Sequence, residues 1–569
     1  MGHKRGKDRG QLTMIPFTPG DYIDEGNPCR AIDTFVDALD LVAMGFRHAA
    51  TKRIGCNPYS PWDMLKLYIY GYMYRIHSSR RLEAEAKRNV EVMWLLNGLV
   101  PDDKTICNFR ADNQKALREV FRMFNKMCIN LGLFGCKIVA VDGTKIKANN
   151  SRKHQYTKRG AEEQLLKLDK KISVFMNEID SNDAAEANDA RIELAEVAAS
   201  LESIKGMIAE LSSEVARTED GGGAPAASIG GAAAGASVKA TDGEAEPEKA
   251  TTRTEDGGGA PAASIGGAAA DALKKMMERK SELESIIARI DENGGNPVCT
   301  VDGDAAMMKQ GGGKGFDVCY NVQTAVDEKN GLIAHFEVTN HGNDICELSG
   351  MAAGAKEELG VDSIIVLGDK GYSNGREIAA CEAAGDTCLI PKPEPSHQPE
   401  DKRCRRDQFI YDAEKDIYTC PEGNEMPHVR TRERDGFKVY ANRAACNGCP
   451  SKELCTKSKT LREIERNPYQ EQVDSADANA KGNKGLYDRR MELSEHPFGV
   501  VKRVWGYGQY LCRGKGKVEG ETSLMFLAFN FRRALNIMGV DKLREAMIMS
   551  MATAALPLAD GNEPKEAAA

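Results

Sequence analysis

Apolar residues recur every three or four positions through residues 31–125, as in AIDTFVDALDLVAM and PWDMLKLYIYGYMYRI. This spacing predicts several amphipathic helices. The pattern changes at CKIVAVDGT (136–144), where a short apolar and β-branched run predicts a buried strand that ends in a turn at Asp142 and Gly143. We therefore expect a helical domain at 31–130, followed by a sheet.

The alternation of strands and helices continues further along the chain. GFDVCYNVQTAVD (315–327) and GLIAHFEVTN (331–340) predict a hairpin, because a short polar connection joins two strand-like runs. DICELSGMAAGAKEEL predicts a helix, SIIVLGD (363–369) a central strand, REIAACEAAG a short helix and TCLIP a last strand. With the strand near 136–144, this order predicts a mixed α/β sheet.

Long helical segments interrupt that sheet. Residues 161–215 and 271–292 are rich in Ala, Glu, Leu, Lys and Ile at helical spacing, which predicts paired long helices. We interpret 161–300 as a coiled-coil-like insertion in the catalytic part of the chain. The alternative is that these helices are the purpose of the protein, as a coiled-coil interaction module.

An internal repeat lies between the two helical segments. RTEDGGGAPAASIGGAAA occurs at 217–234 and again, unchanged, at 253–270. Gly, Ala and Pro cannot bury enough apolar surface to offset the entropy lost on ordering, so we expect a flexible linker over 217–270. Two Gly-rich copies are too few for a solenoid, and a tandem duplication explains the match.

The composition argues against a membrane protein, a secreted protein and a disulfide-rich protein. Of the 569 residues, 41% are hydrophobic, and no run reaches the roughly 18 apolar residues that a membrane helix needs. The first residues carry charge without an apolar segment behind them, so we expect no secretory signal and a cytoplasmic protein. Sixteen cysteines with one C-x-x-C pair indicate thiols in a reducing compartment, not a disulfide scaffold.

Charge is segregated along the chain although the net charge is −8. Residues 143–159 hold six Lys or Arg and no acid, and residues 484–533 hold ten against five acids, whereas 217–256 hold eight acids against four bases. The binding of a polyanion depends on the electrostatic field close to the binding site, not on the net charge of the chain. The two basic segments are therefore candidate contacts for a polyanion. The helical domain also has basic residues between apolar ones: Arg80, Arg81, Lys87, Arg88 and Arg110. They favour a DNA-binding domain, against an ordinary helical domain with a solvated basic face.

Two predicted strands end alike, in Val-Asp142-Gly and in Leu-Gly-Asp369-Lys-Gly. Each places a carboxylate at the carboxyl edge of an apolar strand, where open α/β sheets bind ligands. Either aspartate alone is more often a turn residue. If the strands are neighbours, the two carboxylates converge and repel unless a cation lies between them.

A third acidic candidate, Glu495, lies in the basic segment YDRRMELSEHPFGVVKR. Glu495 and Lys502 are seven positions apart, so on one α-helix they would share a face to within about 20°. Pro497 would clash with the carbonyl of Leu493, so we expect the helix to kink or restart there.

At this point the sequence resembles the DDE transposases of bacterial insertion sequences over most of its length. The motifs are VDGTKIKANNS, YNVQTAVD, VTNHGND, LGDKGYSN and EHPFGVVKRVWG. The resemblance implies an RNase H-like catalytic domain and an N-terminal helical domain. The catalytic domain would be assembled from 136–160, 315–395 and 484–540, with terminal tails at 1–30 and 541–569.

The resemblance also implies residue roles. The motif Tyr-x2-Arg-x3-Glu-x6-Lys maps onto Tyr487, Arg490, Glu495 and Lys502, although here four residues separate the arginine from the glutamate. Asp142 would bridge two Mg²⁺ or Mn²⁺ ions, Asp369 would bind one and Glu495 the other. The residues expected on DNA are Lys502, Arg490, Tyr487, Lys145, Lys147, Arg152, Lys153 and Lys370.

A separate Cys-rich insertion is expected at 400–460. Its cysteines Cys420, Cys446, Cys449 and Cys455 could form a tetrahedral zinc site, with Cys404 as a competing ligand. The alternative is a set of unmetallated thiols, since only one pair has C-x-x-C spacing.

The function predicted from these features is metal-dependent cleavage and joining of double-stranded DNA at the element's terminal inverted repeats and at target DNA, by a homodimer. One alternative is a catalytically inactive DNA-binding relic. Another is an RNase H-like nuclease without strand transfer, which the carboxylates alone do not exclude.

Overall fold

The computed structural model describes residues 18–50, 58–150, 154–186, 262–292, 297–310, 315–393 and 404–554, with a few single residues between them. The chain divides into two compact units, Met1–Asn149 with Met307–Ala569, and Asn150–Ala306. Among the described helices, none is both long and apolar enough to span a bilayer.

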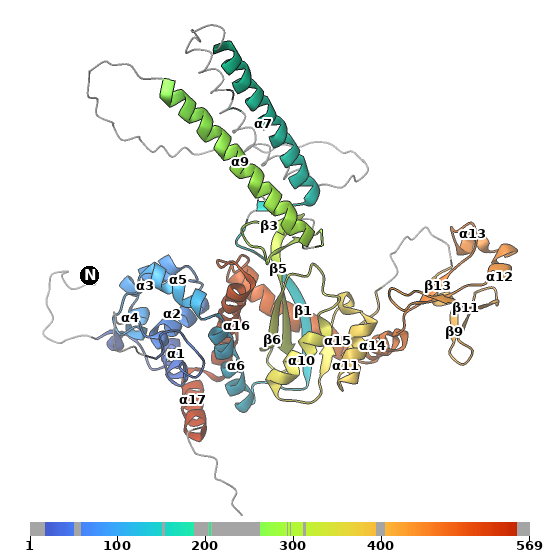
Figure 1. Cartoon of the computed structure of the whole chain (residues 1–569). Helices are drawn as coiled ribbons and strands as arrows, with labels where there is room; N and C mark the ends of the chain where they lie inside the picture. The colour runs from blue at the N-terminus through green and yellow to red at the C-terminus, as the bar shows by residue number, and fades with distance from the viewer. Residues whose placement is uncertain are drawn as a thin grey trace, which may run out of the picture. The chain divides into compact units, whose positions relative to one another are not determined.

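A six-stranded mixed sheet forms the centre of the first unit (Figure 1). Its strands are β1 (Ile138–Lys147), β4 (Ala306–Lys309), β5 (Phe316–Asp327), β6 (Ile333–Thr339), β7 (Ile365–Leu367) and β8 (Thr387–Leu389). β5 pairs antiparallel with both β1 and β6, while β7 pairs parallel with β1 and β8 parallel with β7. The order β6-β5-β1-β7-β8 confirms the predicted mixed α/β class and hairpin, and it is the order expected of an RNase H-like sheet.

Strand β1 is longer than the sequence pattern indicated. It continues through Asp142 and Gly143 to Lys147, and each of these residues is paired with β5, for example Asp142 with Thr324. The prediction of a turn at Asp142-Gly143 is therefore wrong. The long partner strand supplies hydrogen bonds to backbone that the local Asp-Gly signal would otherwise assign to a turn.

Helices cover both faces of this sheet. α14 (Gln470–Gly482) and α15 (Lys484–Phe498) contribute Ala480 and Leu493 to a buried cluster with Ala140 and Leu367. α10 (Leu348–Leu359) packs on β5 and β6, and α11 (Gly375–Ala383) connects β7 to β8.

The N-terminal part is helical, as predicted, with α1 (Pro28–Asp37), α2 (Pro61–Met73), α3 (Ser79–Arg88), α4 (Val90–Leu95), α5 (Asp103–Asp112) and α6 (Gln114–Asn130). It packs against two C-terminal helices, α16 (Lys515–Met538) and α17 (Val540–Ala554). Arg110 is buried, donates to the Tyr72 hydroxyl (3.0 Å) and lies 4.0 Å from Glu521. The interpretation of Arg110 as a DNA contact is therefore wrong, because its charge is used inside the core.

Both terminal tails are shorter than predicted. Within 1–30, a helical turn spans Pro19–Tyr22 and α1 begins at Pro28. Within 541–569, residues up to Ala554 belong to α17, whose Leu543 and Met547 are buried. These segments are ordered because their apolar residues pack on the helical domain.

The second unit is a helical hairpin of α7 (Lys158–Glu186) and α9 (Ala262–Glu292), closed by β2 (Gln155–Tyr156) and β3 (Val298–Cys299) (Figure 1). Lys158 pairs with Asp291 and Lys280 with Asp169, both at 2.6 Å, so the helices run antiparallel. α9 begins within the predicted 217–270 linker, so that prediction is wrong for 262–270, where alanine favours helix. The rest of the linker lies outside the described residues.

The Cys-rich module (residues 404–466) contains a five-stranded antiparallel sheet in the order β13-β12-β11-β10-β9. Its elements are β9 (Ile410–Asp412), β10 (Ile417–Thr419), β11 (Glu425–Thr431), β12 (Lys438–Tyr440), α12 (Arg443–Asn447), α13 (Lys452–Cys455) and β13 (Ile464–Arg466). β13 lies beyond the predicted boundary at 460 and completes the sheet by pairing with β12.

Candidate active site

Asp142 lies in the interior of β1, on the face of the sheet that α15 covers. Ala140, two residues earlier on the same face, packs in the cluster with Leu493 of α15. The backbone N–H of Gly143 donates to Asp142 Oδ1 (2.8 Å). Paired backbone thus holds this carboxylate more rigidly than a turn would.

Asp369 lies two residues beyond the end of β7, level with Asp142. The parallel register pairs Ala140 with Leu367, so the two aspartates are each two residues beyond a paired position. Asp369 Oδ1 accepts a hydrogen bond from the N–H of Gly371 (2.7 Å), as the cap of a short 3-10 helix, Lys370–Tyr372. The predicted convergence of these two carboxylates agrees with this geometry.

Electrostatics supports the same proximity. Burial raises the pKa of Asp142 above its usual value, and the charge of Asp369 raises it further. The Ser494 hydroxyl, the Gly143 N–H and the Arg490 guanidinium oppose that rise. Two neighbouring carboxylates therefore share one site with a cationic side chain beside them.

Helix α15 brings Tyr487, Arg490 and Ser494 to this site. The Arg490 guanidinium lies 5.8 Å from the centre of the Tyr487 ring, and its buried Nε has no hydrogen-bond partner among the described residues. The hydroxyl of Ser494, which is fully buried, is likewise unpartnered by ordinary hydrogen-bond geometry within the described chain. Both side chains thus present unused polar atoms close to Asp142.

Glu495 does not join the two aspartates. It is exposed on α15, one residue after the buried Ser494. In the described ranges, no three His, Cys, Asp or Glu side chains are grouped closely enough to hold a metal ion. The structure therefore brings together two of the three predicted metal ligands.

Lys502 reaches β1 from a different kind of helix. α15 continues past Pro497 to Phe498 and is followed by a π-helix, Gly499–Val504, so of the expected kink or restart, a restart at Pro497 is absent. Because a π-turn is wider than an α-turn, the seven-residue spacing that would align Glu495 and Lys502 on one α-helix does not apply here. Lys502 Nζ instead donates to Thr144 Oγ1 (3.0 Å) and to the Lys145 carbonyl (2.7 Å).

The remaining predicted DNA contacts differ in their surroundings. Lys145 Nζ donates to the Lys309 carbonyl (3.0 Å), Lys147 pairs with Asp317 (2.6 Å), and Lys370 is exposed. Arg152 and Lys153 lie outside the described residues.

Two family models match this chain. One, described as "Transposase domain (DUF772)", covers residues 17–112, and the other, "Transposase DDE domain", covers residues 419–535. The two matches together support an insertion-sequence DDE transposase. No curated protein and no solved structure matches it. The first match lies on the N-terminal helices, and the second includes α15 and most of the Cys-rich module.

In this transposase, a polar network that the sequence reasoning missed lies under the opposite face of β1. Asp344 Oδ1 accepts hydrogen bonds from Asn321 (2.7 Å) and Gln323 (2.6 Å), and the Tyr372 hydroxyl donates to Gln323. A Cβ at Gly143 would collide with Gln323 and Asp344, so glycine is needed here. The available signal was the alternation of Asn321 and Gln323 in an otherwise apolar strand.

Ser494 was also missed, although its position gave a signal. It follows Arg490 by four residues, so it lies one helical turn along the same face of α15. Glu495 is rotated about 100° from that face. The transposase thus has a serine where its helix meets Asp142.

Proposed function

We propose that this transposase binds double-stranded DNA at the ends of its element and catalyses metal-dependent strand cleavage followed by strand transfer. The observation that carries the proposal is the juxtaposition of Asp142 and Asp369 beneath Arg490. Two neighbouring carboxylates on the face of the sheet that α15 covers, with an unpaired guanidinium nitrogen beside them, suit a phosphodiester that is bound together with cations.

The donor set fits Mg²⁺ or Mn²⁺. Asp142 and Asp369 supply oxygen ligands. Burial, with the charge of Asp369 in addition, raises the pKa of Asp142, and a bound cation would oppose both effects. We assign Glu495 as the third ligand, which requires its exposed side chain to turn toward the aspartates. When bound, two such ions would stabilise the charge on the attacking and leaving oxygens.

The basic residues would hold the scissile strand. Arg490 offers a planar fork to a phosphate, with Tyr487 supporting the guanidinium. Lys502 would act by its charge while anchored to β1. Lys145, Lys147 and Lys370 would follow the backbone nearby.

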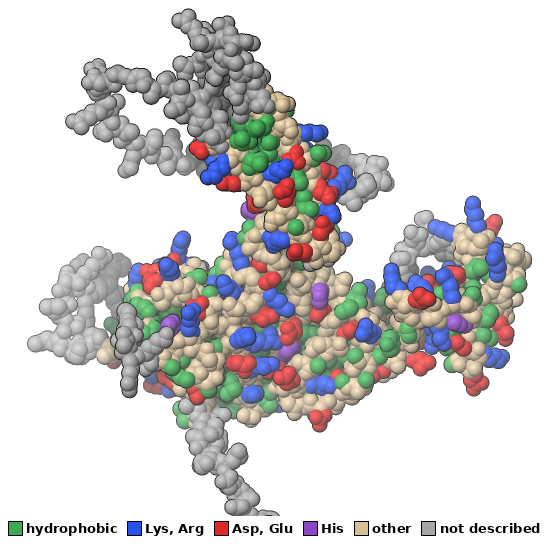
Figure 2. Space-filling model, viewed as in Figure 1, with side chains coloured by type: hydrophobic (Ala, Val, Ile, Leu, Met, Phe, Trp, Pro, Cys, Tyr) green, Lys and Arg blue, Asp and Glu red, His purple; other side chains and the backbone are tan. Residues whose placement is uncertain are grey.

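The surface charge fits local contacts to the backbone. Figure 2 shows Lys and Arg side chains interspersed with Asp and Glu over the visible face, not gathered in one basic patch. DNA affinity would therefore depend on particular basic residues near the site, and it would weaken as salt is raised.

The chemistry comprises two phosphoryl transfers. Water first attacks a phosphorus at the element's end, the bond to the 3′ oxygen breaks, and a 3′-hydroxyl and a 5′-phosphate remain. That 3′-hydroxyl then attacks a phosphorus of target DNA and displaces the 3′ oxygen there, which leaves as a new hydroxyl. Arg490 would orient the phosphate in both steps without a covalent protein intermediate.

A homodimer is part of the proposal, because two element ends must be held together for joining. The α7–α9 hairpin is the segment we assign to contact with DNA or the second copy. Among its described side chains, four large apolar ones are exposed: Leu166, Val174, Met176 and Met277. Exposed apolar side chains on a paired helix are available for such a contact.

The test is cleavage and joining of a duplex that carries the element's own ends, with Mg²⁺ or with EDTA, for wild type and Asp369→Asn. Metal-dependent nicking and joining that vanish in the variant would support the proposal. Nicking without joining would favour a nuclease. Binding of the ends without cleavage under any metal would favour an inactive DNA-binding protein.

A further inference from the structure

The Cys-rich module has a very small apolar core. Its buried cluster contains five residues, Phe409, Tyr418, Met426, Tyr440 and Ile464. A module of this size with so few buried side chains gains little from burial, and such modules are commonly held together by a disulfide or a metal. Its cysteines are all free.

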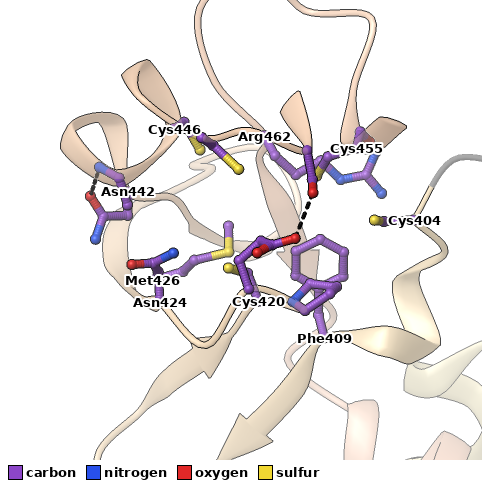
Figure 3. A pocket seen from close by; sticks show the side chains of 14 residues that line it. Cys404, Phe409, Cys420, Asn424, Met426, Asn442, Cys446, Cys455 and Arg462 are labelled. Atoms are coloured by element: carbon purple, nitrogen blue, oxygen red, sulfur yellow. Dashed lines mark hydrogen bonds between the residues drawn. The ribbon is translucent and has the colours of Figure 1, made fainter. Parts of the chain in front are cut away.

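Five cysteines of the module line one small cavity of about 30 Å³ (Figure 3). They are Cys404, Cys420, Cys446, Cys449 and Cys455. Each is partly buried, and they come from four separate segments that are up to 51 positions apart (Cys404 to Cys455). The fold has therefore collected thiols from distant points around a space that suits a single ion.

The backbone at Cys420 forms a tight turn that presents the thiol. The N–H of Gly423 donates to the Cys420 carbonyl (2.8 Å), and the Cys420 N–H donates to the Asn424 carbonyl (2.9 Å). Gly423 has φ +78°, a left-handed conformation that side chains disfavour. Opposite this turn, Cys446 lies in α12, and Cys449 follows three residues later.

We propose that Cys420, Cys446, Cys449 and Cys455 bind one structural Zn²⁺ ion that holds the module together. Four thiolates satisfy the tetrahedral preference of zinc, and soft sulfur ligands select it over Mg²⁺. As the side chains stand, no three thiols in the described chain form a metal-binding group, so binding requires rotation of the cysteine side chains toward the cavity.

Arg462 supplies a compensating charge. It also lines the cavity, its guanidinium lies 5.5 Å from the centre of the Phe409 ring, and it donates to the Cys455 carbonyl (3.4 Å). A zinc ion with four thiolates has a net charge of −2. A cation beside it offsets part of the cost of burying that charge.

Cys404 is the spare thiol. It precedes the first strand of the module, and its N–H donates to the Leu454 carbonyl (2.7 Å), which holds it beside Cys455. In Figure 3 its sulfur lies at one side of the cavity, apart from Cys420 and Cys446. The other four belong to turns and helices that the sheet itself positions.

The experiment measures metal content in the full-length chain purified without a metal-affinity step. We expect about one zinc per chain by elemental mass spectrometry. Cys420→Ser, Cys446→Ser, Cys449→Ser and Cys455→Ser should each lose most of it. Cys404→Ser, inside the cavity, and Cys346→Ser, an exposed cysteine elsewhere, should keep it.

A second measurement guards against variants that do not fold. A mercurial reagent added to folded wild type should release zinc in step with modification of four thiols, as followed with a zinc-sensitive dye. Wild type without zinc, or with iron in its place, would overturn the proposal. Loss of zinc from Cys404→Ser with retention in Cys420→Ser would overturn the ligand set. No DNA enters either assay, so failure here is separable from failure of the proposed function.

Discussion

Asp142 lies in a strand that is paired on both sides and covered by α15, whereas the thiols of the Cys-rich module border a cavity beside a core of five side chains. The sheet has enough buried surface to hold two like charges next to each other before any cation binds. The Cys-rich module buries too little apolar surface to offset a comparable electrostatic repulsion.

The difference teaches where a metal matters for folding. On the α15 face of the sheet, packing already positions the two carboxylates. A bound cation would therefore take part in catalysis without being needed for folding. In the module, the proposed zinc would supply folding energy itself. Removing metal should therefore abolish cleavage at the carboxylate site without unfolding the sheet, whereas it should destabilise the Cys-rich module.

The largest expected effect is on cleavage. Asp142→Asn and Asp369→Asn should each lower the cleavage rate by about 10³-fold or more, because a neutral amide binds a divalent cation poorly. DNA binding by gel shift and the unfolding midpoint should stay close to wild type. Asp362→Asn, an exposed residue before β7, is the control. Cleavage within a few fold of wild type in either variant would remove that residue from the site.

The next effect sharpens the contrast between the two regions. Removing zinc should speed amide hydrogen exchange in β9–β13 by about tenfold or more, since local stability there depends on the metal. Exchange in β1 and β5 should not change, with zinc-loaded protein dialysed into Mg²⁺-free buffer as the reference. Equal exchange rates in the module with and without zinc would mean that its small core suffices.

A third prediction concerns the polar network of Gln323 and Asp344, which packs against β1 on the face opposite Asp142. Gly143→Ala should destabilise the protein by about 1–3 kcal/mol, because the new methyl group displaces the hydrogen-bonded Gln323 and Asp344 side chains. Urea unfolding measures the loss, and the cleavage rate should fall with it. Gly342→Ala, where a Cβ meets open space, is the matched control. A stable and fully active Gly143→Ala protein would show that the network does not position β1.

A smaller effect is expected at Ser494. Ser494→Ala removes the hydroxyl beside Asp142 and should raise the Mg²⁺ concentration for half-maximal cleavage by about tenfold, as loss of a supporting side chain does at other metal sites. The rate at saturating Mg²⁺ should change less. Ser363→Ala, an exposed serine, controls for the substitution itself. An unchanged Mg²⁺ dependence would make Ser494 a packing residue only.

How much the sequence could predict differs between the same regions. Five strands of the sheet and their succession along the chain followed from short apolar runs, since a buried strand leaves few alternatives for such residues. The edge strand β4 was not predicted. The length of β1 did not follow, because Asp142-Gly143 has a local turn signal that only pairing with β5 overrides. The closeness of Asp142 and Asp369 was predictable, since parallel neighbours align their ends.

The placement of α15 was less predictable. Its facing residues depend on where α-helix gives way to π-helix after Pro497, and this switch leaves no periodic signal. Spacing alone therefore could not separate Ser494 from Glu495 as the residue that meets Asp142. The thiol cavity was partly predictable, since four cysteines were close in sequence, but the inclusion of Cys404 depends on a backbone hydrogen bond to Leu454.

The smallest expected effect concerns pH. The ring of His335 in β6 is buried beside Glu337 and Glu358, with Arg118 also facing it. Burial lowers the pKa of His335, but the Glu337 carboxylate at 3.2 Å and the Glu358 carboxylate at 3.7 Å outweigh it, and the net pKa is raised. The same contacts lower the pKa values of Glu337 and Glu358 against the opposing effect of burial.

A raised histidine pKa stabilises the fold fully below the unfolded value of 6.5, and that contribution is lost as pH rises through the folded value. The lowered carboxylate pKa values stabilise above 4.5 and lose their effect in acid. Wild type should thus exceed His335→Gln in unfolding free energy most clearly between pH 4.5 and 6.5, by on the order of 1 kcal/mol. Urea titrations at pH 5.5 and 9 test this, and an advantage that grows toward pH 9 would contradict it. Because the group lies on the α10 face of the sheet, away from Asp142, DNA cleavage should show no matching pH change, which would separate scaffold stability from site chemistry.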